Sequence, residues 1–84
     1  MAYSVSIKQS AAKALQKIVL EDRLRIVAAI DQLAANPVAG SVLKGEFSGL
    51  RRIRIGGYRV VYEVQNQQLT VLVIRIGHRR EVYR

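Results

Sequence analysis

The first residues of the chain alternate between apolar and polar side chains. On one side of an extended chain lie Tyr3, Val5 and Ile7, and on the other lie Ser4, Ser6 and Lys8. A period of two is that of a β-strand with one buried face and one face in water. The pattern therefore predicts a half-buried strand over residues 3–8.

Helical spacing replaces this alternation after the strand. Ser10 stands where a helix N-cap is expected, and the spacing predicts a first helix over residues 10–19. A second helical run begins at the acidic pair of residues 21–22, where the helix dipole favours negative charge. Its expected buried stripe consists of Leu24, Val27, Ile30 and Leu33. Pro37 ends this helix, because the residue before a proline avoids helical backbone angles.

The second half of the chain has the pattern of strands separated by turns. Residues 50–55 and 58–64 alternate on either side of Gly56 and Gly57, two residues that tolerate the positive φ of a tight hairpin turn. Residues 69–76 are apolar or β-branched at nearly every position, which is typical of a central strand covered on both faces. The stretch from 38 to 49 is interpreted as a connection.

These elements fit one α+β domain spanning residues 1–84. The predicted order is β-α-α-β-β-β, in which a helical hairpin packs on one face of a small, mostly antiparallel twisted sheet. A chain of 84 residues closes one modest core. No internal repeat or compositional shift indicates a second domain.

Charge adds a functional expectation to this fold. Fourteen Lys and Arg against six Asp and Glu give a net charge of +8. The excess is +2 in residues 1–43 (five basic, three acidic) and +6 in residues 44–84 (nine basic, three acidic). Eight of the nine basic residues in the second part are arginine, whose planar fork can hold a phosphate at two points. The pattern indicates an anionic partner, although such charge also serves solubility alone.

Several classes of chemistry are poorly supported. Without cysteine there is neither a disulfide framework nor a thiolate metal site, and a reducing, cytoplasmic location is expected. One histidine and six scattered acids make a transition-metal site or a two-metal nuclease improbable. Nucleotide-binding glycine loops, targeting segments and membrane-length apolar stretches are not found. We therefore expect no metal, no cofactor and no membrane partner.

The first candidate site is a group of arginines on one face of the sheet. If Ile53 and Ile55 face the helices, alternation sends Arg52 and Arg54 to the opposite face. The hairpin turn then brings Arg59 beside them. Crowded like charges destabilise the fold, and an anionic ligand would offset this repulsion. The alternative is that these arginines are only the solvated face of an edge strand.

A second basic cluster lies at the end of the sequence and contains His78, Arg79, Arg80 and Tyr83. If the last strand ends beside the hairpin, these side chains reach the rim of the arginine face. RNA supplies its own nucleophile, the 2′-hydroxyl, so metal-free cleavage needs positioning, charge stabilisation at phosphate and proton transfer. Arginine stays protonated, which leaves His78 and Tyr83 as candidates for proton transfer. Their alternatives are a surface histidine and a packing tyrosine.

Residues 43–45 (Leu-Lys-Gly), 50–62 and 76–83 together resemble the RelE branch of the RelE/ParE toxins, over nearly the whole chain. The resemblance implies the toxin of a type II toxin–antitoxin pair. Such a toxin is an endoribonuclease that enters the ribosomal A site and cleaves the bound mRNA, inhibiting translation. It also implies an antitoxin partner of the RelB type, which we expect to be an extended, acidic, partly helical segment wrapping the sheet.

The resemblance also implies roles for individual residues. Arg52 and Arg54 would contact phosphate, Arg59 and Arg79 would stabilise charge in the transition state, and Tyr83 would transfer a proton or stack on a base. His78 would share the acid–base role. Further candidate phosphate contacts are Lys44, Arg51 and Arg80. Arginines stand at 52 and 54 where lysines are often found, which reduces proton donation there, and the extra C-terminal helix of some members is not expected.

Two rival functions stay open. A ParE-like toxin of the same fold would bind DNA gyrase and cut no RNA. A plain nucleic-acid-binding module would use the same arginines without catalysis. Retention of the arginine–tyrosine set favours the nuclease.

Overall fold

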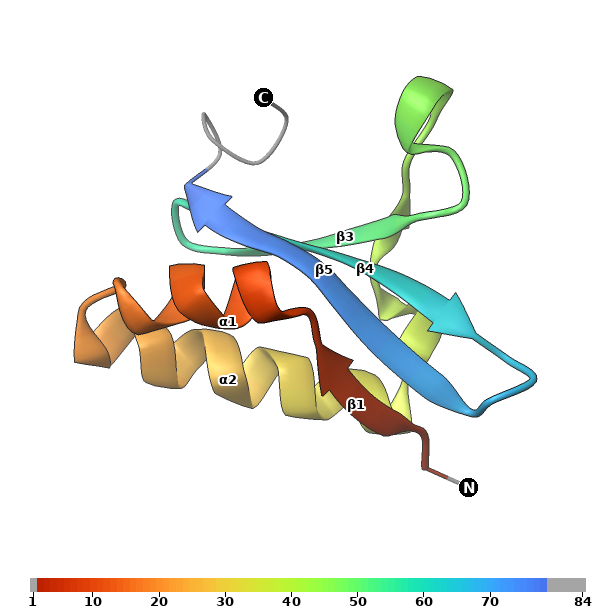
Figure 1. Ribbon diagram of the computed structural model, residues 1–84, viewed down its shortest axis with the longest axis horizontal. Helices are drawn as coiled ribbons and strands as arrows, with labels where there is room; N and C mark the ends of the chain where they lie inside the picture. The colour runs from red at the N-terminus through yellow and green to blue at the C-terminus, as the bar shows by residue number, and fades with distance from the viewer. Residues whose placement is uncertain (1, 79–84) are drawn as a thin grey trace.

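Two helices cover one face of a five-stranded sheet in the computed structural model, which describes residues 2–78 (Figure 1). The strands are β1 (Ser4–Ile7), β2 (Ser41–Val42), β3 (Arg51–Ile55), β4 (Tyr58–Gln65) and β5 (Thr70–His78). The helices are α1 (Gln9–Gln16) and α2 (Leu20–Ala35), and two 3-10 turns, η1 (Pro37–Ala39) and η2 (Gly45–Phe47), flank β2. The sheet order is β1-β5-β4-β3-β2, and only the β1–β5 pair is parallel within this range. The predicted α+β architecture is confirmed.

Some element bounds differ from the sequence-based expectation. The first helix begins at Gln9, because Lys8 has the extended angles (φ −59°, ψ 143°) of the residue before a helix, so Ser10 is not the N-cap. The last strand continues to His78, where it still pairs with β4. Strand β2 was predicted as part of a connection. With only two residues it shows no alternation, and it exists because it pairs with β3.

The core lies between the helices and the sheet. Helix α2 contributes Ile26, Ile30 and Leu33, each at most 1 % exposed, and full burial of such a side chain stabilises the fold by about 1.5–3 kcal/mol. The predicted stripe was wrong in its N-terminal half, because Leu24 is 59 % exposed and Val27 is 36 % exposed. Three residues of a helix fall roughly 60° short of a full turn. Three such steps separate Leu24 from Leu33, so these two side chains point to opposite sides of α2. Spacings of four and three keep the observed stripe on one face.

A buried clamp holds η1 and Gly40 against β3 and β4. The Tyr62 hydroxyl donates to the carbonyl oxygen of Pro37 (2.7 Å) and accepts from the Gly40 N–H (2.9 Å). The Arg51 guanidinium donates to the Gly40 carbonyl oxygen (2.9 Å). We call these four residues the Tyr62 clamp. Tyr62 itself is 0 % exposed, and its hydroxyl both donates and accepts a hydrogen bond inside the protein, as a buried polar group requires.

Tyr62→Phe should weaken the fold in a pH-dependent way. At neutral pH the free energy of unfolding should fall by about 1–3 kcal/mol, because the buried Gly40 N–H loses its acceptor. Burial raises the pKa of the Tyr62 phenol above its ordinary value of 10.0, while the Gly40 hydrogen bond and Arg51 act in the opposite direction. A raised folded-state pKa stabilises the fold below pH 10.0 and this contribution disappears as pH rises through the folded value. The wild type should therefore lose stability at alkaline pH more steeply than the variant.

Urea unfolding at neutral pH and at several values above about pH 10 measures this difference. Tyr3→Phe is the matched control, because the Tyr3 hydroxyl bonds the Asn66 side chain at an exposed position. In Tyr3→Phe the free energy of unfolding should fall with rising pH as steeply as it does in the wild type. If the free energy of unfolding depended on pH in the same way in the wild type and in Tyr62→Phe, Tyr62 would not be the source of the alkaline loss of stability.

In the described part of the chain neither helix has the length and apolar run needed to cross a membrane.

Candidate nucleic-acid interface

Arginine side chains gather on the face of the sheet that the helices do not cover. In β3 and β4, Ile53 is paired with Val60 on the helix side, where both join the core. Alternation places Arg52, Arg54 and Arg59 on the other side. Arg54 and Arg59 are direct cross-strand partners, as the hairpin turn predicted. Two guanidinium groups therefore start from neighbouring backbone positions on one open surface.

A further arginine joins this face from the next strand. Val61 is paired with Arg52 on one side and with Arg75 on the other, so these residues form one row across three strands. The two arginine backbones are about 10 Å apart, since neighbouring strands are spaced by roughly half that distance. Val61 is 1 % exposed although it lies outside the helix-side core, so it forms an apolar floor between them. We call Arg52, Arg54, Arg59 and Arg75 the arginine face.

Arg75 was not among the predicted site residues. The only sequence signal for it was the break that it makes in the apolar run of residues 69–76. Arg52, Arg59 and Arg75 each have an interaction within the protein. An anionic ligand would therefore bind residues that already have an interaction within the protein.

The charge on this face is polarised along β4. Arg59 lies near the hairpin turn, and Glu63 lies near the other end of the strand on the same face. The Glu63 carboxylate accepts a hydrogen bond from the Gln65 side-chain amide (2.8 Å). Beside β2, an open hollow of about 450 Å³ is lined by residues that include Ser41, Arg52 and Arg54. Positive charge and space for a ligand thus coincide at the β2–β3 edge.

Arg51 does not belong to this face. It is paired with Tyr62, and alternation therefore turns it toward the helix side. Its guanidinium donates to the carbonyl oxygens of Gly40 (2.9 Å) and Val38 (3.4 Å). The sequence interpretation grouped Arg51 with the phosphate contacts, whereas the structure places it in the Tyr62 clamp.

His78 also lies on the other side of the sheet. The end of β5 does run beside the hairpin, but His78 is paired with Tyr58 and shares its helix-side face. The two rings meet edge to face, with centroids 6.1 Å apart and an interplanar angle of 83°. The position that faces the arginines is occupied by Gly77, the partner of Arg59. The expected placement of His78 at the rim of the arginine face is therefore wrong.

A family model described as the ParE toxin of the type II toxin–antitoxin system, parDE, matches residues 5–83. The chain belongs to the RelE/ParE family of toxins. It is 30 % identical to Toxin RelG of Mycobacterium tuberculosis (strain ATCC 25618 / H37Rv) over 90 residues, covering 100 % of this chain and 99 % of that protein. The resemblance inferred from the sequence is confirmed.

Solved structures of RelE/ParE toxins share the fold. The toxin in the M. tuberculosis RelBE2 toxin–antitoxin complex superposes with a TM-score of 0.86 at 28 % identity, covering 94 % of this chain and 100 % of that one. An archaeal RelE–RelB complex from Pyrococcus horikoshii OT3 gives a TM-score of 0.79 at 31 % identity, with coverage of 98 % and 100 %. The isolated E. coli RelE toxin gives 0.80 at 28 % identity, with coverage of 98 % and 92 %.

The remaining candidate residues of this toxin fall into two groups. Lys44 is exposed in the segment just before η2. Arg79, Arg80 and Tyr83 lie outside the described residues. Within residues 2–78, no three His, Asp or Glu side chains gather in an arrangement suited to hold a metal ion.

Proposed function

We propose that this RelE/ParE toxin is an endoribonuclease that cleaves mRNA in the ribosomal A site and so inhibits translation. The observation that supports the proposal is the direct cross-strand pairing of Arg54 with Arg59 on the open side of the sheet. Arg52 and Arg75 extend the same surface on either side of Val61. Such a surface is suited to hold a phosphodiester and to stabilise negative charge that develops on it.

The chemistry requires little more from the protein than this surface and a proton-transfer group. The 2′-hydroxyl of the RNA loses its proton and attacks the adjacent phosphorus. The bond from that phosphorus to the 5′-oxygen of the next nucleotide breaks, and this oxygen gains a proton. Arg54 and Arg59 would hold the phosphate and offset the charge of the transition state. Because His78 faces the helix side, Tyr83 is the better candidate for proton transfer, with Arg79 as a further charge stabiliser.

The proposed partners follow from the same charge distribution. A net charge of +8 and an arginine face are suited to ribosomal RNA and mRNA, whose backbones are anionic. They are equally suited to an acidic antitoxin segment that folds on binding. Solved relatives include RelB–RelE complexes, which supports a RelB-like antitoxin for this toxin.

The second candidate function is inhibition of DNA gyrase. It is favoured by the family model itself, which is that of the ParE toxin. The arginine face favours the nuclease, because two arginines opposed directly across strands repel each other and a phosphodiester held between them would offset this repulsion. The two functions leave different products in the cell.

Induced expression of the wild-type toxin in growing cells should produce codon-specific breaks in translated mRNA, mapped by primer extension. The same transcript without a start codon should stay intact, because cleavage depends on the ribosome. Intact transcripts together with a loss of plasmid supercoiling would instead support gyrase inhibition. If the protein binds RNA but causes neither mRNA breaks nor a supercoiling defect, it is a plain nucleic-acid-binding module.

A further inference from the structure

A second basic site lies on the opposite side of the sheet from the arginine face. An open cleft of about 690 Å³ separates α1 from the start of β4 and the end of β5. We call it the α1 cleft, and its lining includes Ser10, Lys13, Lys17, Tyr58, Gly77 and His78. Figure 1 shows the course of α1, which runs beneath the sheet toward the β3–β4 turn and the end of β5.

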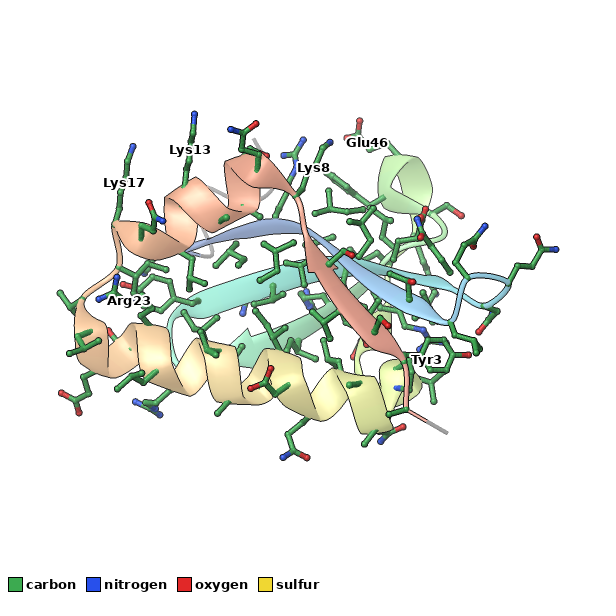
Figure 2. All side chains as sticks on the ribbon, turned by 60° about the horizontal axis from the view of Figure 1, so that its bottom comes forward. Tyr3, Lys8, Lys13, Lys17, Arg23 and Glu46 are labelled. Atoms are coloured by element: carbon green, nitrogen blue, oxygen red, sulfur yellow. The ribbon has the colours of Figure 1, made fainter. Side chains whose placement is uncertain are left out.

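Two lysines supply positive charge at this cleft. Lys13 and Lys17 are four residues apart, so they lie one above the other on the same face of α1. Both are exposed, and Figure 2 shows them projecting from the same side of the molecule. Like charges at this spacing slightly destabilise a helix, and among residues 2–78 no acidic residue lines the cleft. A bound anion would remove this repulsion.

An aromatic surface lies beside the lysines. Tyr58 is half-buried, and its ring meets the His78 imidazole edge to face. Both residues line the α1 cleft. Stacking on such rings is how single-stranded nucleic acid is bound without regard to sequence, in combination with a positively charged groove. The α1 cleft contains both components.

The α1 cleft and the arginine face adjoin at one end of the sheet. Arg59 is paired with Gly77 on the open side, and the next pair, Tyr58 with His78, faces the helices. Neighbouring residues of β4 therefore belong to the two sites. Between them the turn consists of Gly56 and Gly57, and a Cβ at Gly57 would already lie 3.3 Å from His78 Nε2. With no side chain in the turn, a ligand strand can pass close around this end.

We propose that the α1 cleft binds a nucleotide flanking the phosphodiester held by the arginine face. Lys13 and Lys17 bind the phosphate of this nucleotide, and the Tyr58–His78 pair contacts its base. The inference rests on the proposed function and extends it, because it predicts a single-stranded RNA that wraps around the end of the sheet. Binding at two points on opposite faces fixes the direction in which the strand crosses the arginines.

The test measures binding of a single-stranded RNA oligonucleotide whose 2′-hydroxyls are methylated, so that no cleavage can occur. The Lys13→Ala/Lys17→Ala double variant should flatten the log–log salt dependence of binding by about 0.7, the contribution of one phosphate contact on a single strand, because both lysines bind the same phosphate. Tyr58→Ala should weaken binding roughly 5- to 150-fold, and Tyr58→Phe should retain it. Arg25→Ala is the control, because this exposed cation lies on α2 beside Asp22, and its salt slope should equal that of the wild type.

The lysine variant keeps the proposal testable even if Tyr58→Ala fails to fold, since both lysines are exposed. An unchanged salt slope in the lysine variant, or a wild type that does not bind the oligonucleotide, would overturn the α1 cleft as a binding site. If Arg54→Ala flattens the slope while the lysine variant does not, the cleft is wrong and the proposed function stands. If the lysine variant flattens the slope but cells show no mRNA breaks, the cleft binds nucleic acid and the proposed nuclease function fails.

Discussion

Arg59→Ala should slow mRNA cleavage on programmed ribosomes about 10²- to 10³-fold, the usual cost of removing one preorganised group from a developing charge. The side chain lies directly across from Arg54 on the open face, so its removal leaves Arg54 without its cross-strand partner at the phosphate. The fold should persist, because Arg59 is not part of the helix-side core. Single-turnover cleavage of a defined mRNA, followed on a gel, measures the rate.

The controls for this variant separate charge from geometry. Arg59→Lys keeps the charge but loses the planar fork, so its rate should lie between those of the wild type and Arg59→Ala. Arg25→Ala removes an exposed arginine on α2 and should cleave at the wild-type rate. Equal rates for wild type and Arg59→Ala, with circular dichroism showing both folded, would remove the arginine face from the mechanism.

Gly40→Ala should destabilise the fold by about 1–3 kcal/mol, the typical cost of forcing an extra methyl group into a packed site. A Cβ at this position would lie 2.6 Å from the Tyr62 hydroxyl oxygen and 2.7 Å from the Arg52 carbonyl oxygen. Backbone angles do not require glycine here, since φ is −77° and ψ is 157°. The restriction comes from space alone, and one of the two obstacles is backbone, which cannot turn aside.

Urea unfolding of Gly40→Ala is compared with that of Gly57→Ala. At Gly57 an added Cβ would meet only the His78 ring, at 3.3 and 3.5 Å, and a side chain at the surface can shift by a few tenths of an ångström. The control should therefore change stability far less. If both variants unfold at the same urea concentration as the wild type, the Tyr62 clamp is looser than its distances indicate.

Alternation along the chain predicted most of the sheet and the direction of its arginines. It placed Arg52 and Arg54 opposite the helices, because a period of two follows directly from extended backbone. The same alternation puts Arg51 on the side of Ile53 and Ile55, but it does not reveal the acceptors of the Arg51 guanidinium, which are the carbonyl oxygens of Val38 and Gly40. Those acceptors come from a separate turn that no local pattern reveals.

The site was harder to predict where it depends on how strands are paired. His78 follows the apolar run, and its face is decided by its pairing with Tyr58. A shift in register occurs between Val61 and Tyr62, where β4 meets β5. A shift of one residue exchanges the two faces of a strand, so the side chosen by His78 cannot be deduced by counting along the sequence. Gly40 was hidden for a similar reason, since its neighbours Tyr62 and Arg52 are remote in sequence.

The parallel pairing of β1 with β5 has a consequence for how the toxin folds during its synthesis. Among the described residues, the only sheet neighbour of β1 is β5, which follows the other four described strands in the sequence. Strand β5 also supplies Val71, Val73 and Ile76 to the core. Contacts so distant along the chain close late in folding. A growing polypeptide therefore has no complete arginine face until β5, which supplies Arg75, has been synthesised and has paired with β4.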